Sequence, residues 1–269
     1  MNNPVQNQQR RTGPVGIGLI GAGMISDTYL TNLTSFPDVR VLIVGDINPV
    51  RAEAQAKAHH VERWGTPEDV LAHPDVELIV NLTIPAAHIE VATAAIDAGK
   101  HVWTEKPLGI DRESAKEFLD EAARAGLLVG VAPDTAYGPG LQTARRVIER
   151  GDIGTPLSAQ TVIQYPGPQM FHPNPEFLFA TGAGPLFDIG PYYLTALVHL
   201  LGPFASVAGG RVQEPCDSGH PGRRACRYGV PRDRLHARRG YRELRQRSGG
   251  AERLQLRLAA EQDLVRGHR

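Results

Sequence analysis

Residues 15–26 read VGIGLIGAGMIS, a short apolar run that passes directly into a glycine-rich turn. Gly21 permits a tight turn after a strand, and Gly23 lets a pyrophosphate approach the backbone at the start of the following helix. Ser26 stands where the usual G-x-G-x-x-G pattern has its third glycine. The pattern therefore predicts a dinucleotide site, but it also fits a strand-to-helix turn that binds no ligand. The surrounding residues are needed to distinguish these two interpretations.

A second apolar run over residues 39–45 supports the nucleotide interpretation because it ends at Asp46. A carboxylate at this point would accept hydrogen bonds from the adenosine ribose and repel a 2′-phosphate, so NAD is expected and NADP is less favoured. The pyrophosphate is expected beside Met24 and Ile25, at the start of the helix. Arg51 is near enough in the sequence to weaken the preference for NAD, although an exposed helix arginine is the simpler interpretation.

Short apolar runs alternate with amphipathic, Ala-rich stretches over the first half of the chain, a pattern typical of an α/β fold with a parallel sheet. Strands are predicted at residues 15–20, 39–45, 77–82, 101–104 and 127–131. Helices between them are predicted at residues 49–59, 85–98 and 111–125. Asp111 fits a helix N-cap, and Gly99 and Gly126 fit helix C-caps.

Two of these strands deliver polar residues to the same edge of the sheet, beyond which ligands bind in open α/β folds. Thr83 and Pro85 follow the third strand and are expected to line the nicotinamide pocket, with His88 at the next helix start. Pro85 equally fits a first-turn helix proline, and a backbone-satisfied ring is the simpler interpretation of His88. Glu105 and Lys106 follow the fourth strand; a lone ammonium there would polarise a substrate oxygen, unless it is a surface lysine.

The sequence after residue 134 predicts a second, more irregular segment. Helices are expected at residues 141–150 and 188–201, and strands at residues 157–165 and 204–213. The loop between them is rich in proline and aromatic residues. It contains His172, which is either a proton carrier for a substrate or a histidine in solvent.

The ordered set GAGMIS, Asp46, NLTIP, EKPLG and GAGPLFDIGPYY resembles the Gfo/Idh/MocA oxidoreductase family, over residues 15–210. The resemblance implies an NAD(P)-binding Rossmann domain at 14–134 and an α+β domain with an open, mainly antiparallel sheet, here incomplete, at 135–213. It also implies hydride transfer between nicotinamide and a sugar, cyclitol or related polyol. Lys106 corresponds to the catalytic lysine of the family and Asp188 to its aspartate.

Tyr192 occupies a position where that family often has a histidine that acts as general base or acid. Asp188 and Tyr192 are four residues apart on a predicted helix, so both are expected to face a substrate beside Lys106. A phenol with an ordinary pKa of about 10 is a poor base near neutrality unless a cation such as Lys106 lowers that pKa. The alternative is that Asp188 caps its helix while Tyr192 packs under the sheet.

The last 59 residues differ from the rest of the 269-residue chain. Residues 1–210 carry 14 basic and 22 acidic residues, whereas residues 211–269 carry 15 and 7, and all 15 of these basic residues are arginine. The loss of strand-forming residues indicates a coding frame shifted near residues 213–216, so residues 214–269 are not expected to fold natively. The competing interpretation is a basic tail that binds nucleic acid or an acidic partner, although no continuous basic block supports it.

The remaining features bound the class of protein. The nine-residue gap between Cys216 and Cys226 matches no common zinc or redox spacing, so no metal is expected. Residues 1–13 are expected to be a disordered tail, and no membrane span is predicted. A cytoplasmic location is expected, with export as the alternative because Arg10 and Arg11 precede an apolar run. A family-like homo-oligomer is doubtful with an incomplete sheet. A non-catalytic dinucleotide sensor or scaffold is the main alternative to an enzyme.

Overall fold

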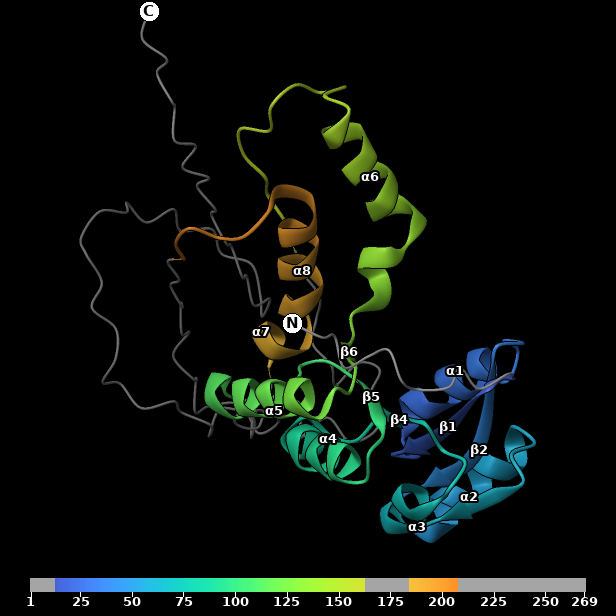
Figure 1. Ribbon diagram of the computed structural model, residues 1–269. Coiled ribbons are helices and arrows are strands. Elements are labelled where there is room, and N and C mark those ends of the chain that lie inside the picture. The colour runs from blue at the N-terminus through green and yellow to red at the C-terminus, as the bar shows by residue number, and fades with distance from the viewer. Residues whose placement is uncertain (1–12, 163–183, 208–269) are drawn as a thin grey trace, which may run out of the picture.

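A six-stranded sheet is the largest element of the computed structural model, which describes residues 13–162 and 184–207, and helices α6 (Pro139–Glu149) and α8 (Gly190–Leu201) lie beyond it (Figure 1). The strands of the sheet are β1 (Val15–Ile20), β2 (Val39–Gly45), β3 (Arg63–Gly65), β4 (Leu78–Asn81), β5 (His101–Thr104) and β6 (Val129–Val131). All pairs are parallel, in the order β3-β2-β1-β4-β5-β6. This is the doubly wound dinucleotide-binding order, which confirms the predicted Rossmann architecture.

Helices cover both faces of this sheet and give it two separate cores. They are α1 (Met24–Leu33), α2 (Pro49–Ala58), α3 (Pro67–Ala72), α4 (His88–Asp97) and α5 (Arg112–Ala125), with the 3₁₀ turn η2 (Pro85–Ala87) before α4. One core packs Leu30 of α1 and Ala56 of α2 against the sheet, and the other packs Ala92 of α4 and Phe118 of α5 against the opposite face. Strands buried on both faces explain why the sequence shows unbroken apolar runs rather than alternation.

Local sequence signals fix the ends of several helices. Asp111 accepts a hydrogen bond from the Ser114 amide at the start of α5, and Gly126 ends that helix with a φ of +70°, so both predicted caps are confirmed. The side chain of Asn48 caps α2 in the same way. The Asn48 and Asp111 caps therefore fix where α2 and α5 begin.

The chain after β6 adds a small helical layer. It consists of η3 (Asp134–Tyr137), α6 (Pro139–Glu149), α7 (Pro185–Asp188) and α8 (Gly190–Leu201). Helices α6 and α8 pack together, with Gln142 Nε2 3.2 Å from His199 Nε2, and α8 also packs on η3 (Figure 1). All six strands therefore precede residue 134, and the described elements after it are helical.

Three expectations about individual elements need correction. β3 and α3 were not predicted, because the strand is only three residues long and its exposed Arg63 and Trp64 give no apolar run. The helix expected from residue 85 begins as the 3₁₀ turn η2. The helix expected at 188–201 is split, so that Asp188 ends α7 while Ile189 is the N-cap of α8.

The predicted antiparallel strands are absent from the described residues. Residues 157–162 and 204–207 belong to segments in which strands were expected, and neither part is a strand. Leu157 is 89% exposed, and Val162 and Val207 are also exposed, so no neighbouring strand covers these apolar side chains in the described part of the chain. The mainly antiparallel sheet predicted for residues 135–213 is therefore not found in the described part of that segment, and the sheet that the structure describes, at residues 15–131, is entirely parallel.

Several expectations concern segments that lie outside the described residues, namely residues 1–12, His172 and the tail at 214–269. Among the helices that the structure describes, none combines the length and the apolar character that crossing a membrane requires.

Candidate active site

The glycine turn between β1 and α1 has the geometry of an anion site. Gly21 has a φ of +106°, and a Cβ there would lie 2.6 Å from the carbonyl carbon and oxygen of Leu82, so only glycine fits. A Cβ on Gly23 would meet nothing within 4 Å, which leaves its surface open. No side chain among the described residues caps α1, and Met24 and Ile25 are exposed. The Met24 and Ile25 amides are thus available to a phosphate, whereas the Ser26 amide donates to the Gly23 carbonyl oxygen at 3.1 Å.

Asp46 links the end of β2 to this turn. Its Oδ2 accepts a hydrogen bond from the Ala22 amide at 2.8 Å, and its Oδ1 accepts from the Asn48 amide at 2.7 Å. Oδ1 also accepts from Arg51 Nη2 at 2.8 Å; the Asp46 side chain is 5% exposed and that of Arg51 is 52% exposed. A carboxylate offers about four acceptor positions, so one on Oδ2 remains for a ribose hydroxyl. Arg51 is therefore a partner of Asp46 rather than an unattached surface residue.

The loop after β4 is organised by Asn81, a fully buried amide at the end of the strand. Its Nδ2 donates to the main-chain oxygen of His88 at 3.0 Å. Its Oδ1 accepts from the amide and the hydroxyl of Thr83, at 3.2 and 2.7 Å. Pro85 is the first residue of η2, a position at which an N–H would have no partner within the helix, so proline is tolerated there. Asn81 was not among the predicted site residues, although a polar residue that ends a buried apolar strand is a signal for it.

His88 does not lie on the surface of this loop. Its ring is 1% exposed, with Nδ1 2.6 Å from the carbonyl oxygen of Pro107 and Nε2 3.0 Å from that of Thr83. The ring therefore contacts main-chain atoms of two different loops and has almost no surface left for a cofactor.

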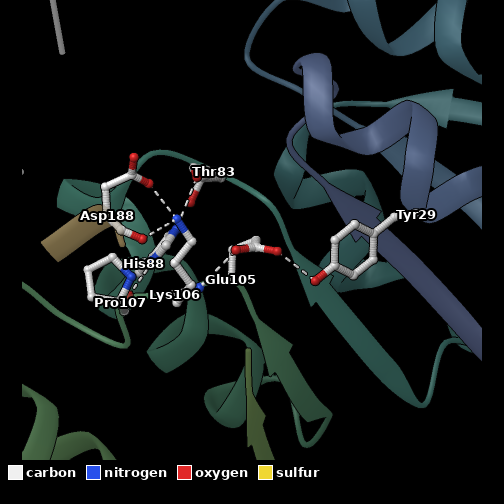
Figure 2. A network of polar contacts seen from close by, with 7 residues as sticks. All are labelled: Tyr29, Thr83, His88, Glu105, Lys106, Pro107 and Asp188. Carbon is white, nitrogen blue, oxygen red and sulfur yellow. Dashed lines mark hydrogen bonds and ion pairs between the residues drawn. The ribbon is translucent and has the colours of Figure 1, made fainter. Parts of the chain in front are cut away.

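Lys106 meets Asp188 at the carboxyl edge of the sheet, where β5 ends (Figure 2). Its Nζ donates to Asp188 Oδ1 at 2.5 Å and to the Asp188 main-chain oxygen at 2.8 Å. The two side chains are 14% and 20% exposed, so the pair is shielded from water without being sealed from it. Lys106 is thus an ion-paired residue of a partly buried site and not a free surface lysine.

Tyr192 completes this cluster from α8. The Lys106 Nζ lies 5.4 Å from the centroid of the Tyr192 ring, within the range of a cation–π contact. Burial raises the pKa of Tyr192 and outweighs the lowering effect of the Lys106 ammonium, while the charges of Glu105 and Asp188 raise it further. The condition under which this phenol would be a base, a pKa lowered by Lys106, is therefore not met, and the hydroxyl keeps its proton near neutrality.

Glu105 extends the polar network away from Lys106 (Figure 2). Its Oε2 accepts from the Lys106 amide at 3.1 Å, and its Oε1 accepts from the Tyr29 hydroxyl of α1 at 2.7 Å. The Trp103 Nε1 donates to the same hydroxyl at 3.3 Å. Burial is the main cause of the raised pKa of Tyr29. The hydrogen bond from Trp103 lowers that pKa by a smaller amount, and the charge and hydrogen bond of Glu105 raise it further. Tyr29 was not predicted, because nothing in its local sequence shows this distant contact.

Two family models match the chain. An oxidoreductase family model with an NAD-binding Rossmann fold matches residues 15–132, and the GFO/IDH/MocA C-terminal domain model matches residues 141–215. Together they cover more than half of the sequence.

Individual relatives agree with the family models. The chain is 32% identical to an inositol 2-dehydrogenase of Saccharopolyspora erythraea over 161 residues, which are 59% of this chain and 48% of the relative. It is 27% identical to the crystal structure of an NAD-binding oxidoreductase from Klebsiella pneumoniae, with a TM-score of 0.65 over 75% of this chain and 57% of the other. A 3-ketoreductase from Actinomadura kijaniata in complex with NADP is 26% identical, with a TM-score of 0.61 over 73% and 59%.

The chain spans about half the length of the curated relatives that it matches. The matched segments contain the glycine turn, and also Lys106 and Asp188, which the structure brings together. The chain belongs to the Gfo/Idh/MocA family of NAD-binding oxidoreductases.

Proposed function

We propose that this protein is an NAD-dependent oxidoreductase that transfers a hydride between nicotinamide and a carbon bearing the hydroxyl group of a sugar, cyclitol or related polyol. The relatives named as inositol dehydrogenases support this substrate class. We also propose that residues 14–134 form the cofactor-binding domain and residues 135–213 the substrate domain. NAD would supply the hydride-accepting ring, and the residues of the chain would bind and orient the reactants.

The nucleotide half of the proposal depends on residues whose geometry fits a dinucleotide. Gly21 makes the turn, and Gly23 with the uncapped start of α1 leaves room and amide donors for the pyrophosphate. Asp46 retains an acceptor position for the adenosine ribose. These three features lie on the β1–α1 and β2–α2 crossovers, beside the point where the strand order reverses at β1.

One observation carries the catalytic half. An ammonium has three N–H donors, and Lys106 gives two of them to Asp188. The third is left for a substrate oxygen, and the Asp188 carboxylate fixes the direction in which the ammonium points. Such a donor stabilises negative charge on the oxygen as it changes between carbonyl and hydroxyl. We assign Tyr192 a part in bounding the same site as a protonated phenol, because its pKa is raised.

The experiment combines cofactor binding with turnover. The chain is titrated with NADH by calorimetry and assayed at 340 nm with NAD and a panel of inositols, hexoses and open-chain polyols. Lys106→Met is expected to lower kcat/KM by about a hundredfold or more with little change in NADH affinity. Lys116→Met, which alters an exposed lysine, is the matched control and should change neither.

Two results would overturn parts of the proposal separately. Failure of the folded chain to bind NADH removes the nucleotide assignment. Binding without turnover of any substrate in the panel favours the sensor or scaffold alternative, and turnover that survives Lys106→Met removes the role of the ammonium.

A further inference from the structure

We infer that His88 is a positioning residue, which holds Lys106 in place by joining the loop after β4 to the loop after β5. This inference rests on the proposed role of Lys106. It assigns His88 no contact with cofactor or substrate, since the ring is 1% exposed.

The two ring nitrogens reach opposite loops. Nδ1 lies 2.6 Å from the carbonyl oxygen of Pro107, the residue directly after Lys106. Nε2 lies 3.0 Å from the carbonyl oxygen of Thr83, in the loop that follows β4. Figure 2 shows the His88 ring with its contacts to these two segments. A single side chain thus connects main-chain atoms on both sides of the proposed nicotinamide pocket.

The main chain of His88 is itself held in place. Asn81 donates to the main-chain oxygen of His88 and accepts from Thr83, so the β4 loop is tied at both of its ends. Strands β4 and β5 pair directly, with Asn81 opposite Thr104, which sets the two loops side by side. The position of the Pro107 carbonyl, and through it the backbone of Lys106, therefore depends on His88.

The chemistry of the contacts requires an N–H donor at this site. Both partners are carbonyl oxygens, which only accept hydrogen bonds; a neutral imidazole donates to one of them and an imidazolium to both. Because His88 is 1% exposed, an apolar replacement there removes the side-chain donor that these carbonyls share without opening the position to water. The Lys106 loop is then expected to shift until its carbonyl finds another partner, which moves the ammonium relative to Asp188.

Competitive labelling of lysines tests this on the full chain without requiring turnover. The chain contains four lysines, so a trace of isotopically labelled acetic anhydride at one fixed pH, followed by peptide mass analysis, gives a rate for each. Lys116 is exposed and serves as the internal reference. Lys100 is buried and donates to two main-chain oxygens far from the loop, so it reports general loosening of the fold.

In His88→Leu, we expect the rate of Lys106 relative to Lys116 to rise about threefold to tenfold, the factor given by the loss of one hydrogen bond, while Lys100 stays within about twofold of its original rate. His88→Gln keeps a side-chain donor and should restore at least part of the protection. His73→Leu is the matched control, because His73 is also buried and its Nδ1 accepts a hydrogen bond from the Asp75 amide, away from the Lys106 loop. That variant should leave the Lys106 rate unchanged.

An unchanged Lys106 rate in folded His88→Leu overturns the inference, and so does a parallel rise of Lys100 and Lys106, which would make His88 a general stability residue. If His88→Leu does not fold, the comparison is made with His88→Gln and His88→Asn, each of which retains one donor at a different place. If Lys106 is then labelled as slowly in both variants as in the parent chain, the inference about His88 is overturned. The labelling rate of Lys106 can be measured even if the chain has no turnover, so this test does not depend on whether the proposed activity is found.

Discussion

Lys106 and Asp188 are joined by two hydrogen bonds although 82 positions separate them in the sequence. Lys106 belongs to the loop after β5, and Asp188 ends α7, so the contact connects the edge of the parallel sheet to the helical layer. Under the proposed function, this pair is where a cofactor bound at the sheet and a substrate held by the second segment would meet.

We expect Asp188→Asn to weaken both the site and the fold. The amide keeps the main-chain acceptor of Lys106 but removes the charged one, which should lower kcat/KM at least about tenfold and the free energy of unfolding by about 1–3 kcal/mol. Urea unfolding and the 340 nm assay measure the two effects. In the double variant with Lys106→Met the two losses should be clearly less than additive; additive losses would mean that the pair does not act as a unit.

The nucleotide preference is expected to depend on both Asp46 and Arg51. The parent chain should bind NADH at least about tenfold more tightly than NADPH, because the Asp46 carboxylate repels a 2′-phosphate. Asp46→Ala should reduce that ratio, and Arg51→Ala should weaken NADPH binding more than NADH binding, because the guanidinium is half exposed beside the same carboxylate. Calorimetric titration of each variant with both nucleotides is the measurement, and an unchanged ratio in Asp46→Ala contradicts the assignment.

Two glycines of the same turn should respond differently to alanine. Gly21→Ala places a methyl group against the Leu82 carbonyl at a positive φ, so it should lower the free energy of unfolding by about 2 kcal/mol or more. Gly23→Ala meets no atom within 4 Å, so its stability should change little while NADH affinity falls at the pyrophosphate site. Thermal unfolding and NADH titration of both variants separate the two roles, and equal effects on stability would contradict them.

Alkaline pH should destabilise the protein through Tyr29. Its pKa is raised in the folded state, chiefly by burial, so the folded chain retains a proton that the unfolded chain loses above about pH 10. The stabilisation is therefore complete below that pH and is lost as the pH rises, at up to about 1.4 kcal/mol per pH unit for one group. Tyr29→Phe should show a shallower decline of unfolding free energy between about pH 10 and 11.5, and identical slopes would contradict the buried, protonated phenol.

The parallel sheet could be predicted because its central strands are buried on both faces and leave continuous apolar runs. β3 gives no such run, since it is a three-residue strand that, among the described strands, pairs only with β2. Two residues expected at the site, Lys106 and Asp188, do meet in the structure, but two of the residues that hold the site together, Asn81 and Tyr29, were not foreseen. Tyr29 and Glu105 are 76 positions apart, and no local periodicity encodes a contact between a helix face and a loop at that separation.

The absence of a side chain at Gly21 sets a spacing between two parts of the proposed cofactor site. The main chain of the β1–α1 turn lies against the Leu82 carbonyl, at a distance that no methyl group would allow. That contact brings the segment that would hold the phosphates directly against the segment that leads to Thr83, on the nicotinamide side. The positions of the pyrophosphate and of the nicotinamide ring would then both be set by this one contact within the Rossmann domain. Substitutions among residues that contact the substrate elsewhere would leave the position of the cofactor unchanged.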